Sequence, residues 1–236
     1  KNSFGGHLSI DASTVASNTA PYGGGIDNGS NPGYTSTITI TNGSLVHANI
    51  ATVGGGGIAN DGDGSTMTIV ASTVSSNTAS GGPGAGIWND RGRMTIDVST
   101  VAANTASTNG GGIYNSNGGV MTLSSSSVVS NSASSGGGGI YNVNSGSLIS
   151  ITVGSVVQGN SAGSNGGGIY NTGSGVMTLS SSSVVSNSAS RGGGIYNEFA
   201  GSVTLTASDV VSNSVTGASS DGGGIYNTGS GSVISM

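Results

Sequence analysis

The stretch Gly110-Gly111-Gly112-Ile113-Tyr114-Asn115 recurs along the whole chain with small changes. Successive isoleucines of this motif are 26 to 32 positions apart, and they are Ile26, Ile58, Ile87, Ile113, Ile140, Ile169, Ile195 and Ile225. A fixed period in this range is typical of architectures in which each repeat stacks on the next. We therefore expect these isoleucines to lie in one interior pile.

A second motif, Ser-x-Val-x-small-Asn-x-Ala, lies between the glycine motifs. Its asparagines are Asn18, Asn49, Asn77, Asn104, Asn131, Asn160, Asn187 and Asn213. We expect them at bends, because asparagine tolerates the left-handed backbone that a bend needs. We also expect their amides to form a hydrogen-bonded ladder along the stack, as in cross-β structures.

A third element alternates apolar and polar residues, as in Met121-Thr122-Leu123. Alternation over a short run bounded by Gly, Asn and Ser predicts a half-buried strand. Val128 has the opposite parity from Met121 and Leu123, so the chain must turn near Ser125 and Ser126. The glycine triplet marks a further bend. No segment has a helical period, and we predict almost no helix.

Three short strands and three bends in each repeat predict one coil of a parallel β-helix. Successive coils would lie about 4.8 Å apart, which is the spacing of strands in any sheet. The chain thus belongs to the all-β class and is expected to form a single solenoid of about eight coils over residues 1–236, uncapped at both ends.

The composition excludes several classes of function. The chain has 236 residues, a net charge of -5, four Lys and Arg residues in total and no cysteine. Such a surface offers little to a nucleic acid, which requires basic side chains. No apolar run is long enough to span a membrane. We expect no nucleic-acid partner and no membrane-spanning segment.

The pairing of the glycine–isoleucine motif with the Val-x-x-Asn-x-Ala motif resembles the repeats of chlamydial polymorphic outer membrane proteins, and is similar to repeats of other bacterial surface proteins. The resemblance covers essentially the whole chain. Members of that family usually have Phe where this chain has Val, and Ala at the third glycine. The resemblance implies a right-handed coil, export to the extracellular space or cell surface, and adhesive or structural roles.

Each end of the chain falls within a repeat, and neither end carries a polar or helical cap. Open ends of a β-helix present unpaired strands, which are templates for association. Two interpretations follow: the sequence is a fragment of a longer protein, or copies of the chain stack head to tail into a filament. Self-association, head to tail or lateral, is one predicted partnership.

An aromatic residue follows the motif isoleucine in six successive repeats. These residues are Trp88, Tyr114, Tyr141, Tyr170, Tyr196 and Tyr226. They should point outward if the isoleucines point inward, and should form an outer aromatic column. Such a column stabilises itself by stacking, packs against a neighbouring rod, or binds sugar rings. Glycans of a host or of a surface are therefore a second predicted partner.

Acidic residues gather in two adjacent repeats, at Asp61, Asp63 and Asp90, with Arg91 and Arg93 beside them. Three oxygen ligands of this kind suit Ca²⁺, and calcium is the one cofactor that the sequence suggests. Paired carboxylates on a β-helix also suit acid–base chemistry on a polysaccharide. A solvated loop with local ion pairs is the third interpretation.

The function that these features favour is that of a structural or adhesive extracellular rod that self-assembles into a filament. The alternative is a carbohydrate-binding or polysaccharide-degrading β-helix protein. Enzymes on this fold usually carry long insertions and clustered charged residues. The longest insertion in this chain is only a few residues, between Asn28 and Ser36, and bases are nearly absent. We expect no catalytic residues and no enzyme activity.

Overall fold

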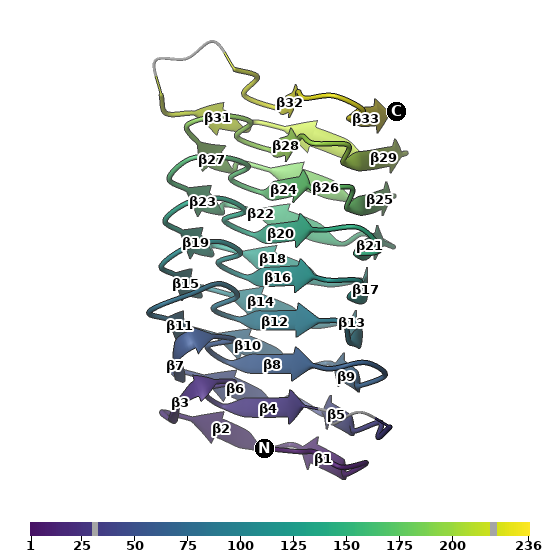
Figure 1. Ribbon diagram of the computed structural model, residues 1–236. Coiled ribbons are helices and arrows are strands. Elements are labelled where there is room, and N and C mark those ends of the chain that lie inside the picture. Colours follow the sequence, from purple (N-terminus) through teal and green to yellow (C-terminus); the bar gives the residue numbers. More distant parts are fainter. Residues whose placement is uncertain (30–32, 218–220) are drawn as a thin grey trace.

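The computed structural model describes residues 1–29, 33–217 and 221–236. Part of the insertion between Asn28 and Ser36 lies outside these residues. The described residues form 33 strands and no helix. The strands make four parallel sheets that run along a single rod, with one strand of each sheet in almost every coil (Figure 1). The predicted parallel β-helix of about eight coils is confirmed.

We name the four sheets by the residue types that recur in them. The threonine sheet contains β1 (His7–Asp11), β5 (Thr37–Thr41), β9 (Thr66–Val70), β13 (Arg93–Asp97), β17 (Val120–Ser124), β21 (Leu148–Thr152), β25 (Val176–Ser180), β29 (Ser202–Thr206) and β33 (Val233–Ser235). The valine sheet contains β2 (Thr14–Ala16), β6 (Leu45–His47), β10 (Thr73–Ser75), β14 (Thr100–Ala102), β18 (Ser127–Val129), β22 (Val156–Gln158), β26 (Ser183–Val185) and β30 (Asp209–Val211).

The other two sheets follow the second and third bends. The alanine sheet contains β3 (Thr19–Tyr22), β7 (Ile50–Gly54), β11 (Thr78–Ala79), β15 (Thr105–Ala106), β19 (Ser132–Ala133), β23 (Ser161–Ala162), β27 (Ser188–Ala189) and β31 (Ser214–Val215). The tyrosine sheet contains β4 (Ile26–Gly29), β8 (Ile58–Asp61), β12 (Ile87–Asp90), β16 (Ile113–Ser116), β20 (Ile140–Val143), β24 (Ile169–Thr172), β28 (Ile195–Asn197) and β32 (Ile225–Asn227). The sequence predicted three strands in each coil, and the short alanine-sheet strand is a fourth.

The register places like residues on like residues. Ile113 pairs with Ile140, and Ile140 pairs with Ile169. All three are fully buried, and the pile continues through Ile195 to Ile225. The expected interior pile of isoleucines is therefore confirmed. The alternate apolar residues of the threonine sheet, such as Met121 and Leu123, and the central valines of the valine sheet, such as Val128, point into the same core.

Small residues make the second bend of each coil, between the valine and alanine sheets. The residue before each motif asparagine has a positive φ of 53° to 62°, and these residues are Ser17, Ala48, Ser76, Ala103, Ser130, Gly159, Ser186 and Ser212. The prediction that the asparagine itself takes the left-handed backbone is wrong. The asparagine side chain points inward to the ladder, and its small predecessor makes the turn.

The motif asparagines form the predicted ladder. In seven consecutive pairs from Asn18 to Asn213, the Nδ2 of one asparagine donates to the Oδ1 of the next at 2.9–3.0 Å. The same Oδ1 accepts the backbone N–H of the preceding asparagine, as Asn160 does from Asn131. Each Nδ2 also donates to a backbone carbonyl, as Asn131 does to Val101. The buried amides are thus satisfied only in the native register.

A second asparagine ladder, which the sequence analysis missed, runs through the tyrosine sheet. It joins Asn2, Asn28, Asn60, Asn89, Asn115, Asn142, Asn171, Asn197 and Asn227 by Nδ2–Oδ1 bonds of 2.7–3.0 Å. Asparagine follows the motif isoleucine by two positions, so it shares the inward face of the strand. The first ladder lies at the bend between the valine and alanine sheets, and the second lies on the tyrosine sheet. Together they fix the register of the coils on two sides of the core.

Replacing Asn131 by Ala tests the first ladder. The change removes the acceptor of the Asn104 side chain and of the Asn104 backbone N–H, both of which are buried. Each unsatisfied buried group costs about 1–3 kcal/mol, so we expect a loss of roughly 3 kcal/mol in the free energy of unfolding measured in urea. Asn18→Ala, in the same ladder but exposed to solvent, is the control and should cost less than about 1 kcal/mol. Equal losses for the two variants would show that the ladder contributes little.

Candidate functional site

The aromatic column lies on the outer side of the tyrosine sheet, because each ring follows an inward isoleucine. Ring centroids are 5.2 Å apart between Tyr114 and Tyr141, 4.7 Å between Tyr141 and Tyr170, 5.1 Å between Tyr170 and Tyr196, and 5.3 Å between Tyr196 and Tyr226. Five tyrosines of five consecutive coils thus make one unbroken set of ring contacts.

Trp88 continues the column toward the N-terminal coils. Its backbone pairs with that of Tyr114. Its ring lies 5.5 Å from the ring of Tyr22, which comes from β3 two coils earlier. Its indole N–H donates to the Ser116 hydroxyl at 3.4 Å. Every residue of the predicted column is therefore in the place that the repeat gives it.

Part of the column is covered, which the sequence did not predict. Tyr170 is 9% exposed and Tyr196 is 2% exposed. Gly136, between the alanine and tyrosine sheets, lies so close to the ring of Tyr170 that a Cβ built on it would be 2.4 Å from that ring. The column is an outer surface only at its half-buried members, which are Trp88, Tyr114, Tyr141 and Tyr226.

Glu198 lies beside the hydroxyl groups of the two covered tyrosines. It is the chain's only glutamate and is 9% exposed. The Tyr170 hydroxyl donates a hydrogen bond to Glu198 Oε1, and the Tyr196 hydroxyl donates to Glu198 Oε2 at 3.0 Å. The Arg191 guanidinium lies over the ring of Tyr196, 5.7 Å from its centroid. Sequence reasoning missed this group, although Glu198 follows Tyr196 by two positions and so shares its face of the strand.

Burial of the tyrosine side chains raises the pKa values of the phenols in the column. It raises the pKa of Tyr141 and of Tyr196 to about 12, and the hydrogen bond to Glu198 adds to the effect at Tyr196. The pKa of Tyr170 is also raised, first by burial and then by its bond to Glu198. The pKa of Tyr114 is raised by burial and by the charge of Asp90. These phenols therefore stay neutral well above their ordinary range.

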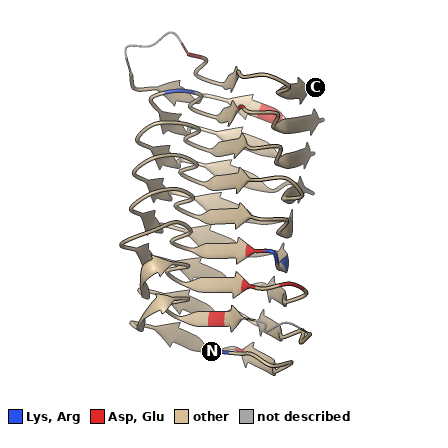
Figure 2. Ribbon diagram, viewed as in Figure 1, with Lys and Arg blue, Asp and Glu red and all other residues tan. Residues whose placement is uncertain are grey.

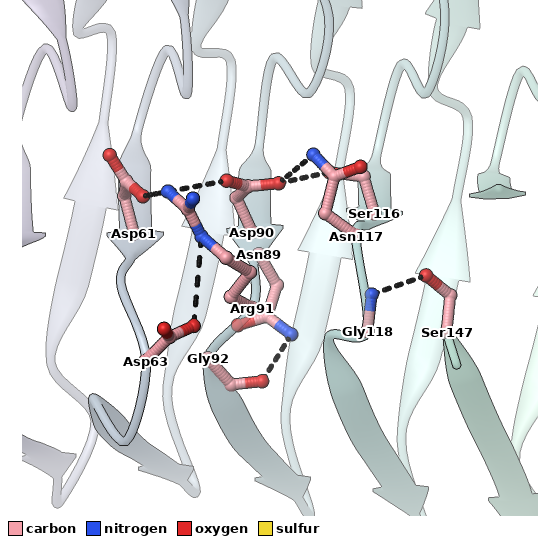
Figure 3. A network of polar contacts seen from close by, with 10 residues as sticks. All are labelled: Asp61, Asp63, Asn89, Asp90, Arg91, Gly92, Ser116, Asn117, Gly118 and Ser147. Atoms are coloured by element: carbon pink, nitrogen blue, oxygen red, sulfur yellow. Dashed lines mark hydrogen bonds and ion pairs between the residues drawn. The ribbon is translucent and has the colours of Figure 1, made fainter. Parts of the chain in front are cut away.

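The acidic residues predicted from the sequence are brought together around one arginine (Figure 3). Arg91 Nη2 lies 2.8 Å from Asp61 Oδ1 and 3.1 Å from Asp90 Oδ2, and Arg91 Nε lies 3.8 Å from Asp63 Oδ1. Figure 2 shows this cluster at the ends of β8 and β12, on a rod that carries few other charges. The three carboxylates and the guanidinium form an ion-pair network.

Asp90 is the buried member of this network, with its side chain 8% exposed. Its Oδ1 accepts hydrogen bonds from the Ser116 hydroxyl at 2.7 Å and from the Asn117 amide at 2.6 Å. The hydrogen bond to Asp61 and the charge of Asp90 raise the pKa of Arg91. Both oxygens of Asp90 are thus bound by protein donors, and the cation at the centre of the cluster is Arg91 itself.

The described residues contain no group of three or more His, Cys, Asp or Glu side chains arranged to hold a metal ion. Calcium binding by Asp61, Asp63 and Asp90 stays a prediction, and Arg91 is the group with which an ion would compete. The residues that the structure describes contain no helix that could cross a membrane.

The fold and these columns define the class of the molecule, which is a parallel β-helix repeat protein. The model of the Chlamydia polymorphic membrane protein repeat matches residues 154–172. These residues run from the bend just before the valine-sheet strand β22 to the end of the tyrosine-sheet strand β24. No curated protein and no solved structure matches the chain. The repeats thus resemble those of a family of bacterial surface proteins.

The raised pKa values predict a loss of stability at high pH. An unfolded tyrosine ionises near pH 10, whereas Tyr141 and Tyr196 in the folded chain ionise at about 12. The folded state therefore binds more protons between these two values, and stability that is complete below pH 10 should fall as the pH rises to 12. Phenolate absorbance and the urea midpoint, both followed against pH, measure this. Tyr196→Phe should make the midpoint less sensitive to pH, and an unchanged slope would contradict the assignment.

Removing Arg91 tests what the acidic cluster can bind. We expect Arg91→Ala to lower stability at low salt, because the charges of Asp61, Asp63 and Asp90 are then left facing one another. In this variant, Ca²⁺ at tenfold its dissociation constant should restore about 1.4 kcal/mol. The unchanged chain should melt at the same temperature with and without a chelator. A chelator-sensitive melt of the unchanged chain would instead show that calcium binds beside Arg91. Arg93→Ala is the matched control.

Proposed function

We propose that the chain is a non-catalytic structural and adhesive rod of a microbial cell surface. The observation that carries the proposal is the unbroken stacking of strands in the four parallel sheets over the described coils, from β1 to β33. Each coil adds a nearly identical layer, so length and stiffness come from repetition. The likeness of residues 154–172 to the repeat of a Chlamydia membrane protein supports a surface location.

The surface of the rod supports a binding role better than a catalytic one. One open depression, with a volume of about 310 Å³, is lined by strand residues of the threonine sheet such as Thr66, Thr95 and Thr122. The cluster of carboxylates around Asp90 is paired with Arg91. A polysaccharide-degrading site would need one carboxylic acid and one free carboxylate facing a bound sugar. Incubation with acidic polysaccharides should therefore release no reducing sugar.

Glycan contact is the second candidate for the adhesive role, and one observation favours it. The half-buried rings of Trp88, Tyr114 and Tyr141 lie on one sheet, and the exposed amide residue Asn117 comes directly after strand β16 of that sheet. Aromatic rings near an exposed amide suit sugar rings, which have apolar faces and hydroxyl edges. The covered Tyr170 and Tyr196 are excluded from this surface.

End-to-end association of copies is the remaining part of the proposal. Both asparagine ladders donate from each coil to the next coil toward the C-terminus. A coil of a second copy with the same motifs would extend both ladders without a change of geometry. Lateral packing of rods through the half-buried rings is the other form of self-association.

Tyr114→Ser tests the adhesive surface without disturbing the covered rings. If the half-buried rings contact a partner, Tyr114→Ser and Tyr141→Ser should each weaken binding to glycan arrays or to cells by about tenfold or more, as loss of an aromatic anchor does. Val153→Ser, on an exposed corner away from the column, is the control and should bind as the unchanged chain does. Equal binding by all four proteins would overturn the assignment of the surface. Electron micrographs of the same samples, showing rods or filaments against single compact particles, test self-association separately.

A further inference from the structure

Packing of the aromatic column does not require that two phenol hydroxyls donate to the Glu198 carboxylate. In the described part of the column, only the hydroxyls of Tyr170 and Tyr196 donate to a carboxylate. Both rings and the carboxylate are 9% exposed or less. The carboxylate therefore acts as a fixed acceptor for phenol protons, within a sequence of ring contacts that reaches the surface at Tyr114, Tyr141 and Tyr226.

The chemistry of phenol oxidation gives this arrangement a consequence. When a tyrosine loses an electron, its hydroxyl becomes strongly acidic and must lose its proton. In a buried site without an acceptor, the positive charge would be costly. At Tyr170, the proton has only to move along an existing hydrogen bond to Glu198 Oε1. The products, a neutral tyrosyl radical and a neutral carboxylic acid, leave the buried site with no net charge.

We propose that Tyr170 and Glu198 form a redox-active site. When a diffusible one-electron oxidant oxidises the aromatic column, the radical that results is located on Tyr170. The oxidant takes one electron from a half-buried ring of the column and is itself reduced. An electron then passes from Tyr170 to that ring through ring contacts of 4.7–5.3 Å. The Tyr170 proton moves to Glu198, and no other bond is made or broken.

One feature favours Tyr170 over Tyr196 as the site of the radical. The Arg191 guanidinium lies over the ring of Tyr196, and its positive charge opposes removal of an electron from that ring. Both tyrosines contact a ring on each side, so the ring contacts provide an electron path to either of them. The proposal does not depend on the surface role proposed above.

The test is flash oxidation of the whole chain by a photogenerated ruthenium(III) polypyridyl complex. The tyrosyl radical is followed by transient absorption and by electron paramagnetic resonance of frozen samples. We expect a radical in the unchanged chain that outlives that of Tyr170→Phe and of Glu198→Gln by roughly tenfold or more, because a hydrogen bond to a charged group is worth at least that factor. Tyr34→Phe is the control, since Tyr34 is 50% exposed and makes its ring contact with Phe4 rather than the column. It should leave the long-lived signal unchanged.

A long-lived radical of unchanged lifetime in folded Tyr170→Phe or Glu198→Gln would overturn the proposal. Circular dichroism establishes whether each variant is folded. If a variant is unfolded, 3-fluorotyrosine introduced at position 170 keeps both the ring and the hydrogen bond. Its fluorine should then split the resonance spectrum of the long-lived radical. A spectrum without that splitting would show that the radical resides elsewhere and would equally overturn the proposal.

Discussion

The spacing between stacked strands is the constraint on which the rest of the molecule depends. Coils that lie about 4.8 Å apart bring every residue onto its equivalents in the coils before and after. For an asparagine amide, this distance lets Nδ2 of one coil reach Oδ1 of the next, as Asn104 does with Asn131 at 2.9 Å. A slip of one residue in any coil would leave such amides buried without partners. Polar groups therefore specify the register as strictly as the apolar core does.

The bends follow from the same constraint, because the chain must turn within one layer. Glycine is favoured where two coils approach closely: a Cβ on Gly111 would lie 2.4 Å from the backbone oxygen of Ser132. The third coil has Ala85 at the equivalent position, fully buried in a small cluster with Ala79 and Ala106. The repeat thus tolerates one methyl group at a position where the other coils use glycine. Bends made by Ser and Ala carry positive φ values that their small side chains tolerate, while the asparagine ladder holds them in place.

The sequence predicted what repetition determines and missed what depends on the path of individual segments. The isoleucine pile and the first ladder could be read from the period alone. The second ladder was equally visible, since Asn115 and Ile113 have the same parity in one strand. The burial of Tyr170 could not be predicted, because it depends on how closely the chain near Gly136 passes over the ring. The position of Arg91 among three carboxylates depends on a side-chain conformation that no spacing specifies.

The buried carboxylates of Asp90 and Glu198 occupy the same position of the repeat, beside the aromatic column of the tyrosine sheet. The position two residues after the aromatic ring is Asp90 in β12, Ser116 in β16 and Glu198 directly after β28. The repeat specifies the backbone at this position and leaves the side chain free, so a carboxylate there is placed beside the rings and is paired by what lies nearest. Near β12 the partner is an arginine, and near β28 the partners are two phenols. The unusual charged groups of this rod therefore arise where a single residue departs from the repeat within a geometry that the other coils have already fixed.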